Sequence, residues 1–169
     1  MTTHRVGHYV IAWVVAGVVG SLTFWLVQVL SGGSTITAFM GDQIVSAGSY
    51  PRSLTALTGW AVHLGVSVAY AFLFAVVAAT VWRASLPVAA SVTLLGALVL
   101  GWITAVIAPP AISVTIGVLS GRGWPSELFP LNFELGLPLW NHVIFFVLNW
   151  VVQVLGPRLF RRRLAAKRP

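Results

Sequence analysis

The chain of 169 residues has no cysteine and very few charged residues. The absence of cysteine excludes a disulfide framework, a thiolate metal site, an iron–sulfur cluster and covalent c-type haem attachment. Charged residues make up 8% of the chain, against about 25% in a typical soluble domain. Because so few charges cannot form a water-facing surface, and 58% of the residues are hydrophobic, the sequence predicts an integral membrane protein.

Four apolar segments are long enough to cross a bilayer, which takes roughly 17–25 residues. None contains aspartate, glutamate, lysine or arginine between its ends. The apolar run of the first segment exceeds the roughly 7–15 residues of a signal-peptide core, so we expect it to be retained. The sequence thus predicts one all-α integral membrane domain over 1–169, with four transmembrane helices. The four segments are 6–30, 60–82, 87–108 and 138–155.

Basic residues predict the orientation, because cytoplasmic loops carry an excess of lysine and arginine. Eight of the ten basic residues lie on one side of the predicted spans, and all three acidic residues lie on the other. We therefore expect a multi-pass protein of the cell (inner or plasma) membrane with both termini in the cytoplasm. The basic C-terminal tail is interpreted as an anchor on anionic lipid, not as a nucleic-acid site. The eight residues are Arg5, Arg83, Arg158, Arg161, Arg162, Arg163, Lys167 and Arg168.

The two outer loops are unusually apolar and about 28 residues long. Structureless loops longer than about 12–15 residues are uncommon, so we expect short interfacial helices in them. Large exposed apolar patches usually mark interaction sites. We therefore expect the loop side chains to be buried by the chain's own helices, by lipid headgroups or by another subunit, either a membrane-protein partner or a second copy. The side chains concerned are Trp124, Phe129, Pro130 and Phe133.

The order of landmarks suggests an internal repeat of 1–83 in 84–162. A shift of 79 residues aligns His63 with His142 and Tyr70 with Asn149. Two hairpins of the same orientation imply a pseudo-twofold axis along the membrane normal, as in parallel repeats of transporters. The sequence therefore predicts two parallel-repeat hairpins.

Polar residues inside the second and fourth segments are the candidate site. A step of seven residues is nearly two helical turns, so His63 shares a helix face with Tyr70, and His142 shares one with Asn149. Polar residues in membrane spans normally face the bundle interior. We therefore expect two interior polar stripes, each with a histidine near its outer end.

Two interpretations of the histidines stay open. The first is interhelical hydrogen bonding, which adds roughly 0.6 kcal/mol per bond. The second is axial ligation of a b-type haem by His63 and His142. Four glycines would then leave room for the macrocycle, and Arg52 or Arg122 could meet the propionates. Another metal is less favoured, because no carboxylate or cysteine accompanies the pair. The four glycines are Gly17, Gly20, Gly96 and Gly101.

Three functions are consistent with the sequence. The first is a non-catalytic accessory or structural subunit of a larger membrane assembly, and the second is a haem-bearing electron-transfer subunit. The third is a small-solute channel or carrier. We find no nucleotide-binding loop, no Ser-His-Asp arrangement and no paired carboxylates in a span, so a non-catalytic role is favoured over an enzyme. Proton coupling is disfavoured, because no span carries an acid.

Overall fold

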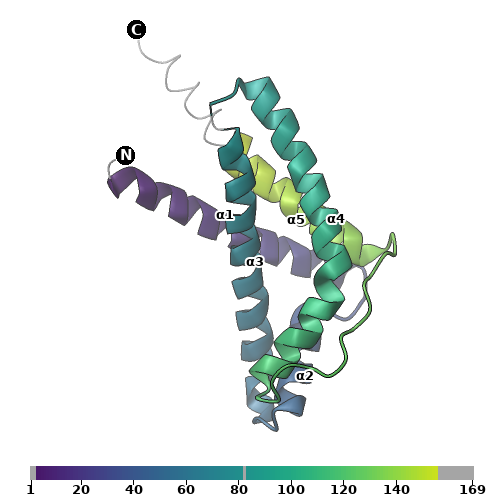
Figure 1. Cartoon of the computed structure of the whole chain (residues 1–169). Helices are drawn as coiled ribbons and strands as arrows, with labels where there is room; N and C mark the ends of the chain where they lie inside the picture. The colour runs from purple at the N-terminus through teal and green to yellow at the C-terminus, as the bar shows by residue number, and fades with distance from the viewer. Residues whose placement is uncertain (1–2, 82, 156–169) are drawn as a thin grey trace.

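The computed structural model describes residues 3–81 and 83–155, and this part of the chain is all-helical, with no strand (Figure 1). Five α-helices follow one another along the chain. A short 3-10 helix, η1, precedes α3, and a π-helical segment, η2, continues α5. The elements are α1 (Thr3–Leu30), α2 (Ile36–Ala47), η1 (Arg52–Leu54), α3 (Thr55–Thr80), α4 (Leu86–Leu119), α5 (Leu137–Trp150) and η2 (Val151–Leu155).

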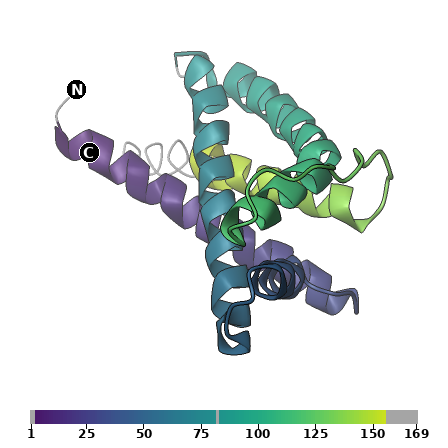
Figure 2. The same cartoon turned by 60° about the horizontal axis from the view of Figure 1, so that its bottom comes forward.

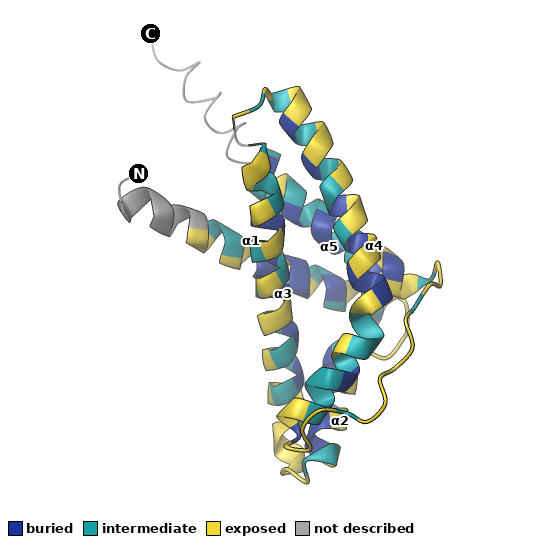
Figure 3. Cartoon of the chain, in the orientation of Figure 1, coloured by how far each residue is buried: buried dark blue, intermediate teal, exposed yellow. Residues whose placement is uncertain are grey.

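Four of these helical stretches are long and apolar enough to cross a membrane, as the sequence predicts. They lie in α1, in η1 with α3, in α4, and in α5 with η2. Apolar side chains are exposed along their outer sides, where they would contact lipid (Figure 3). The chain is therefore a multi-pass membrane protein in contact with the bilayer. The basic residues of the C-terminal tail lie outside the described residues.

The sequence predicted that the third span ends at Ala108, and this prediction is wrong. Helix α4 continues through Pro109 and Pro110 to Leu119 and bends on the way (Figure 1). A proline inside a helix removes one backbone donor and kinks the helix, but it does not have to end it. The carbonyl of Val106 loses its usual donor at Pro110, and the N–H of Asn132 replaces that donor at 3.0 Å. The helix can continue because the freed acceptor is satisfied from outside it.

Helix α4 is also longer than one membrane crossing requires. Its 34 residues, at 1.5 Å each, extend for about 51 Å, whereas the hydrocarbon core is about 30 Å thick. Its last turns therefore reach beyond the span. They lie beside α2, and the hydroxyl of Tyr50 donates to the carbonyl of Leu119 at 3.2 Å (Figure 1).

The two long loops, which the sequence predicts on the outer side, differ in structure. The first contains α2, which matches the expected short helix. Its N-terminus is capped by Thr35, whose hydroxyl accepts from the N–H of Ala38 at 3.2 Å. The second consists of the end of α4 and an irregular segment over 120–136. The interfacial position of α2 and the internal repeat stay predictions.

Glycines allow the helices to cross at short distance. Helix α1 crosses α3 in both views (Figures 1 and 2), and a Cβ on Gly17 would lie 2.8 Å from the Cα of Val68. A Cβ on Gly101 of α4 would lie equally close to the Cα of Val143 of α5. No side chain fits between backbones at these distances. The four-helix arrangement therefore depends on small residues at its crossings, as is common in membrane bundles.

The core lies where α1, α3, α4 and α5 meet. Aromatic side chains dominate it: Phe74 and Phe146 are fully buried, and Phe24 and Phe145 pack with them. Polar groups occur in the same interior. Gln153 of η2 donates from Nε2 to the carbonyl of Ala71 on α3, at 3.1 Å. This bond ties the last helix to α3 within the bundle.

Candidate ligand-binding cavity

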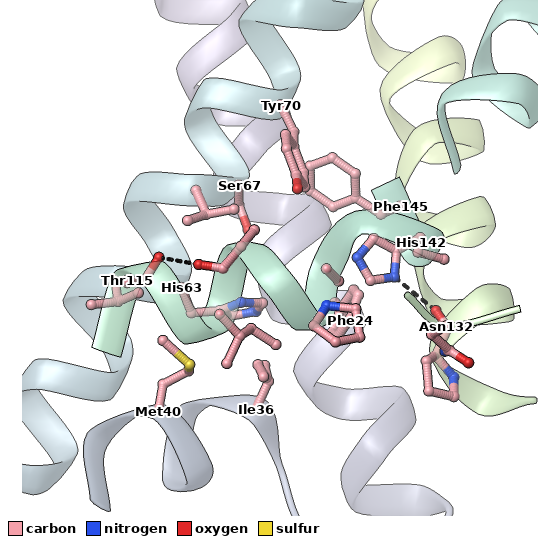
Figure 4. Close-up of a pocket in the computed structure, with 18 of the residues that line it drawn as sticks. Phe24, Ile36, Met40, His63, Ser67, Tyr70, Thr115, Asn132, His142 and Phe145 are labelled. Atoms are coloured by element: carbon pink, nitrogen blue, oxygen red, sulfur yellow. Dashed lines mark hydrogen bonds between the residues drawn. The ribbon is translucent and has the colours of Figure 1, made fainter. Parts of the chain in front are cut away.

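A cavity of about 270 Å³ lies between the helices, and all five of them contribute to its wall (Figure 4). Most of its lining is apolar, and both candidate histidines face it. His63 comes from the third turn of α3, and His142 comes from the second turn of α5. Pockets with apolar walls and a few placed polar groups are typical of small-molecule sites.

His63 is buried, with 8% of its surface exposed, and it is held by one hydrogen bond. Its Nε2 lies 3.2 Å from the carbonyl oxygen of Ser21 on α1. Because a carbonyl can only accept, Nε2 must carry the proton and donate. In the neutral ring Nδ1 is then an acceptor, and Nδ1 has no hydrogen-bond partner among the described residues.

His142 repeats this arrangement with its nitrogens exchanged. Its Nδ1 donates to the carbonyl of Pro138, one turn earlier in α5, at 2.7 Å. Its Nε2 is left as the acceptor, without a partner among the described residues. Figure 4 shows this nitrogen on the side of the ring that faces the cavity. Each imidazole is therefore fixed by a carbonyl at one nitrogen and free at the other.

Phe24 separates the two imidazoles. Its ring centroid lies 5.4 Å from that of His63 and 5.2 Å from that of His142, in edge-on contact with both. Figure 4 shows the phenyl ring between the two histidines. The described geometry therefore places an aromatic ring, not an open gap, against both imidazoles.

The other polar side chains at the cavity are uncharged. Ser67 and Tyr70 of α3 line it, and no aspartate, glutamate, lysine or arginine of residues 3–81 and 83–155 does. Gln28 accepts the N–H of Ile36 through Oε1 at 2.9 Å, at the start of α2. Asn132 accepts the N–H of Glu134 through Oδ1 at 3.0 Å. The described residues contain no group of three or more histidine, cysteine or acidic residues that could hold a metal ion.

The structure brings three of the four predicted site residues together at the cavity: His63, His142 and Tyr70. Asn149 is fully buried but does not line it. Its Nδ2 donates to the carbonyl of Phe145, one turn earlier in α5. Its Oδ1 accepts from Nε2 of Gln153 at 3.0 Å. Asn149 therefore belongs to a separate polar network that joins α5 to α3.

The residues expected to accommodate a haem are used in other ways. None of the four glycines lines the cavity, and each lies against a neighbouring helix: Gly20, for example, faces the ring of Phe145. Arg52 pairs with Asp42 of α2, at 2.8 Å between Nη1 and Oδ1, on the exposed surface. Arg122 lines a different, surface pocket together with Glu127. The described geometry leaves neither a slot for a macrocycle nor a cation at the cavity.

Sequence reasoning missed three residues that define the cavity: Phe24, Pro109 and Asn132. The sequence does not mark Phe24 as interior, because apolar residues occur on all sides of its helix. The Pro109–Pro110 pair does carry one, because two missing N–H groups leave two carbonyls in need of donors. That signal could have pointed to a segment packed against α4. Comparison of the chain with family models, with curated proteins and with solved structures finds no match.

Proposed function

We propose that the protein is a non-catalytic accessory subunit of a larger membrane assembly, with 124–135 as its contact surface. The observation that carries this proposal is the exposure of apolar side chains in this irregular segment. Trp124 is 73% exposed, Phe133 65% and Leu135 76%. The chain's own helices therefore do not cover them, which leaves lipid headgroups or another subunit.

The backbone conformation favours another subunit. Backbone that is not helical cannot lie in the lipid core, because its N–H and C=O groups would lack partners there. The segment also carries Glu127 and Glu134, which disfavours deep insertion. A solvent-facing patch of this kind is unusual on a lone protein and typical of an interaction site. The partner is a membrane protein or a second copy of this chain.

The proposal is tested by the size of the complex in gently solubilised membranes of the native host. A variant with Trp124→Ser, Phe133→Ser and Leu135→Ser should elute as a smaller species than the natural chain, since the surface that binds the partner is lost. The matched control is Val76→Ala with Leu95→Ala, which removes exposed apolar surface from membrane-spanning helices. The control should keep the large species. A natural chain that elutes as a monomer would disprove the proposal.

A haem-bearing subunit is the second candidate. Histidines that bind a metal usually donate their other ring N–H to a carbonyl or carboxylate, and His63 and His142 both donate to carbonyls. Two observations disfavour haem: Phe24 contacts both histidine rings, and the cavity of about 270 Å³ is small for a macrocycle. The test is an absorption spectrum of the purified protein, oxidised and then reduced. A Soret band that His63→Ala and His142→Ala each abolish would support haem, and a fully assembled preparation without visible absorption would reject it.

A further inference from the structure

We propose that the cavity between α3, α4 and α5 binds the hydroxyl-bearing aromatic headgroup of an uncharged, lipid-soluble molecule, of the phenol or quinol class. This site does not rest on the proposed contact surface over 124–135, although Asn132 of that segment lines the cavity. The argument concerns three properties of the cavity: which hydrogen bonds it offers, what its walls are made of, and where it opens.

The free nitrogens determine the polarity of the ligand. Nδ1 of His63 and Nε2 of His142 are acceptors, because the opposite nitrogen of each ring donates to a carbonyl. A ligand that satisfies them must therefore donate a hydrogen bond, as a hydroxyl group does. A ketone or an ether cannot, since it only accepts.

Charged donors and anions are both disfavoured. Among the described residues, the lining contains no aspartate or glutamate to neutralise an ammonium group and no lysine or arginine to hold a carboxylate or phosphate. Burying a charge without a partner costs far more than one hydrogen bond returns. The ligand that fits the cavity is consequently neutral and carries a hydroxyl group.

The walls favour a ring. Phe24, Tyr70 and Phe145 line the cavity from α1, α3 and α5. Aromatic pairs in edge-on or offset contact gain free energy beyond that of their buried area. The volume of about 270 Å³ lies just below the roughly 300–1,000 Å³ of pockets for drug-sized ligands. It suits a single substituted ring better than a macrocycle.

Part of the cavity wall reaches the surface of two candidate spans. Val66 of α3 and Ala111 of α4 both line the cavity and are exposed on the outer surface. Both lie within candidate spans, where exposed apolar side chains contact lipid. A molecule dissolved in the bilayer can therefore reach the histidines without passing through water.

The donor requirement is tested with two probes of nearly equal shape. The natural chain is placed in lipid nanodiscs, and binding of para-propylphenol and of its methyl ether, para-propylanisole, is measured by saturation-transfer NMR, with empty nanodiscs as the blank. The phenol should bind saturably, and the ether about tenfold more weakly because it has no proton to donate. Equal binding of both probes, or binding no stronger than to the blank, would overturn the proposal.

Two substitutions separate the free nitrogens from the structural ones. His142→Asn keeps a donor for the carbonyl of Pro138, and His63→Gln keeps one for the carbonyl of Ser21. Each replaces the free ring nitrogen by an amide oxygen at a different position. Each should weaken phenol binding about fivefold to tenfold and leave binding of the ether unchanged. Loss of affinity for both probes alike, or for neither, would contradict the role of the acceptors.

Two further variants serve as checks. Ala108→Leu fills the cavity and should abolish binding of the phenol while both histidines stay in place. Thr93→Val, at a fully buried residue of α4 that does not line the cavity, should leave binding unchanged. Thermal unfolding of every variant identifies those that do not fold. If a variant does not fold, the comparison of the two probes on the natural chain still decides the proposal. A Soret band in the natural chain would show haem in place of a phenol.

Discussion

The backbone N–H of Asn132 donates to the carbonyl oxygen of Val106 at 3.0 Å. Val106 is four residues before Pro110, so its carbonyl is the one that Pro110 leaves without an intrahelical donor. This single bond links the irregular segment 120–136 to the bend of α4. Because Asn132 also lines the cavity, the bond holds one wall of the candidate site in place.

Removing that donor should loosen the segment. Asn132→Pro has no backbone N–H and should lower the free energy of unfolding by about 0.5–1.5 kcal/mol relative to the natural chain. It should also speed proteolysis within 120–136. Asn132→Ala, which loses only the side chain, is the control and should keep the bond to Val106. Denaturant unfolding and limited proteolysis measure both effects, and equal behaviour of the two variants would refute the role of the backbone bond.

Helix α2 should depend on two glycines. Gly41 of α2 and Gly59 of α3 face one another, and a Cβ on Gly59 would overlap the backbone carbonyl of Thr37. Since backbone cannot move aside, Gly59→Ala should destabilise the protein by about 1–3 kcal/mol. Gly65→Ala, on the same helix with nothing within 4 Å, should be neutral or stabilise by up to about 1 kcal/mol. Comparable destabilisation by both variants would mean that the close approach of Gly59 to Thr37 does not set the cost, because Gly65 has no such neighbour.

The four spans could be predicted from sequence because lipid exposure makes each helix apolar along its whole length. The same property hid how the helices pack. Phe24 separates the two histidines, yet it occurs in a segment where every face is apolar, so no periodicity marks it as interior. The interior position of His63 could be predicted, because an imidazole needs a partner that lipid does not offer.

The end of the third span could not be predicted by the usual rule that proline stops a helix. Helix α4 continues beyond Pro110 because the backbone N–H of Asn132, which is distant in sequence, donates to the carbonyl of Val106. The separation of Asn149 from the cavity was equally hidden. Gln153, one turn after Asn149, donates a hydrogen bond to the side-chain oxygen of Asn149. Helical spacing alone cannot predict this bond, because it places all of these residues on one face.

The orientation of the chain is open to a direct test, because it contains no natural cysteine that would react. Ser46→Cys and Ser126→Cys should each be labelled by an impermeant thiol reagent in intact cells, since both residues are exposed on the predicted outer side. Ala166→Cys, which lies outside the described residues, should be labelled only after the cells are opened. The reverse pattern would place the termini outside.

The last prediction compares two asparagines of α5 that are both fully buried. Asn149 hydrogen-bonds through both ends of its amide, whereas neither the oxygen nor the nitrogen of Asn141 has a partner among the described residues. Burying an amide without hydrogen-bond partners costs about 1–3 kcal/mol. Removal of the Asn141 amide should therefore not lower the free energy of unfolding. We expect Asn141→Ala to leave the free energy of unfolding unchanged or raise it, and Asn149→Ala to lower it by about 1 kcal/mol or more.

The measurement is denaturant unfolding of the purified single chain, with the natural chain as reference. Both substitutions remove the same atoms from the same helix at the same burial, so packing losses are matched and hydrogen bonding is the main difference between them. If Asn141→Ala destabilises the single chain as much as Asn149→Ala does, the Asn141 amide is satisfied within that chain.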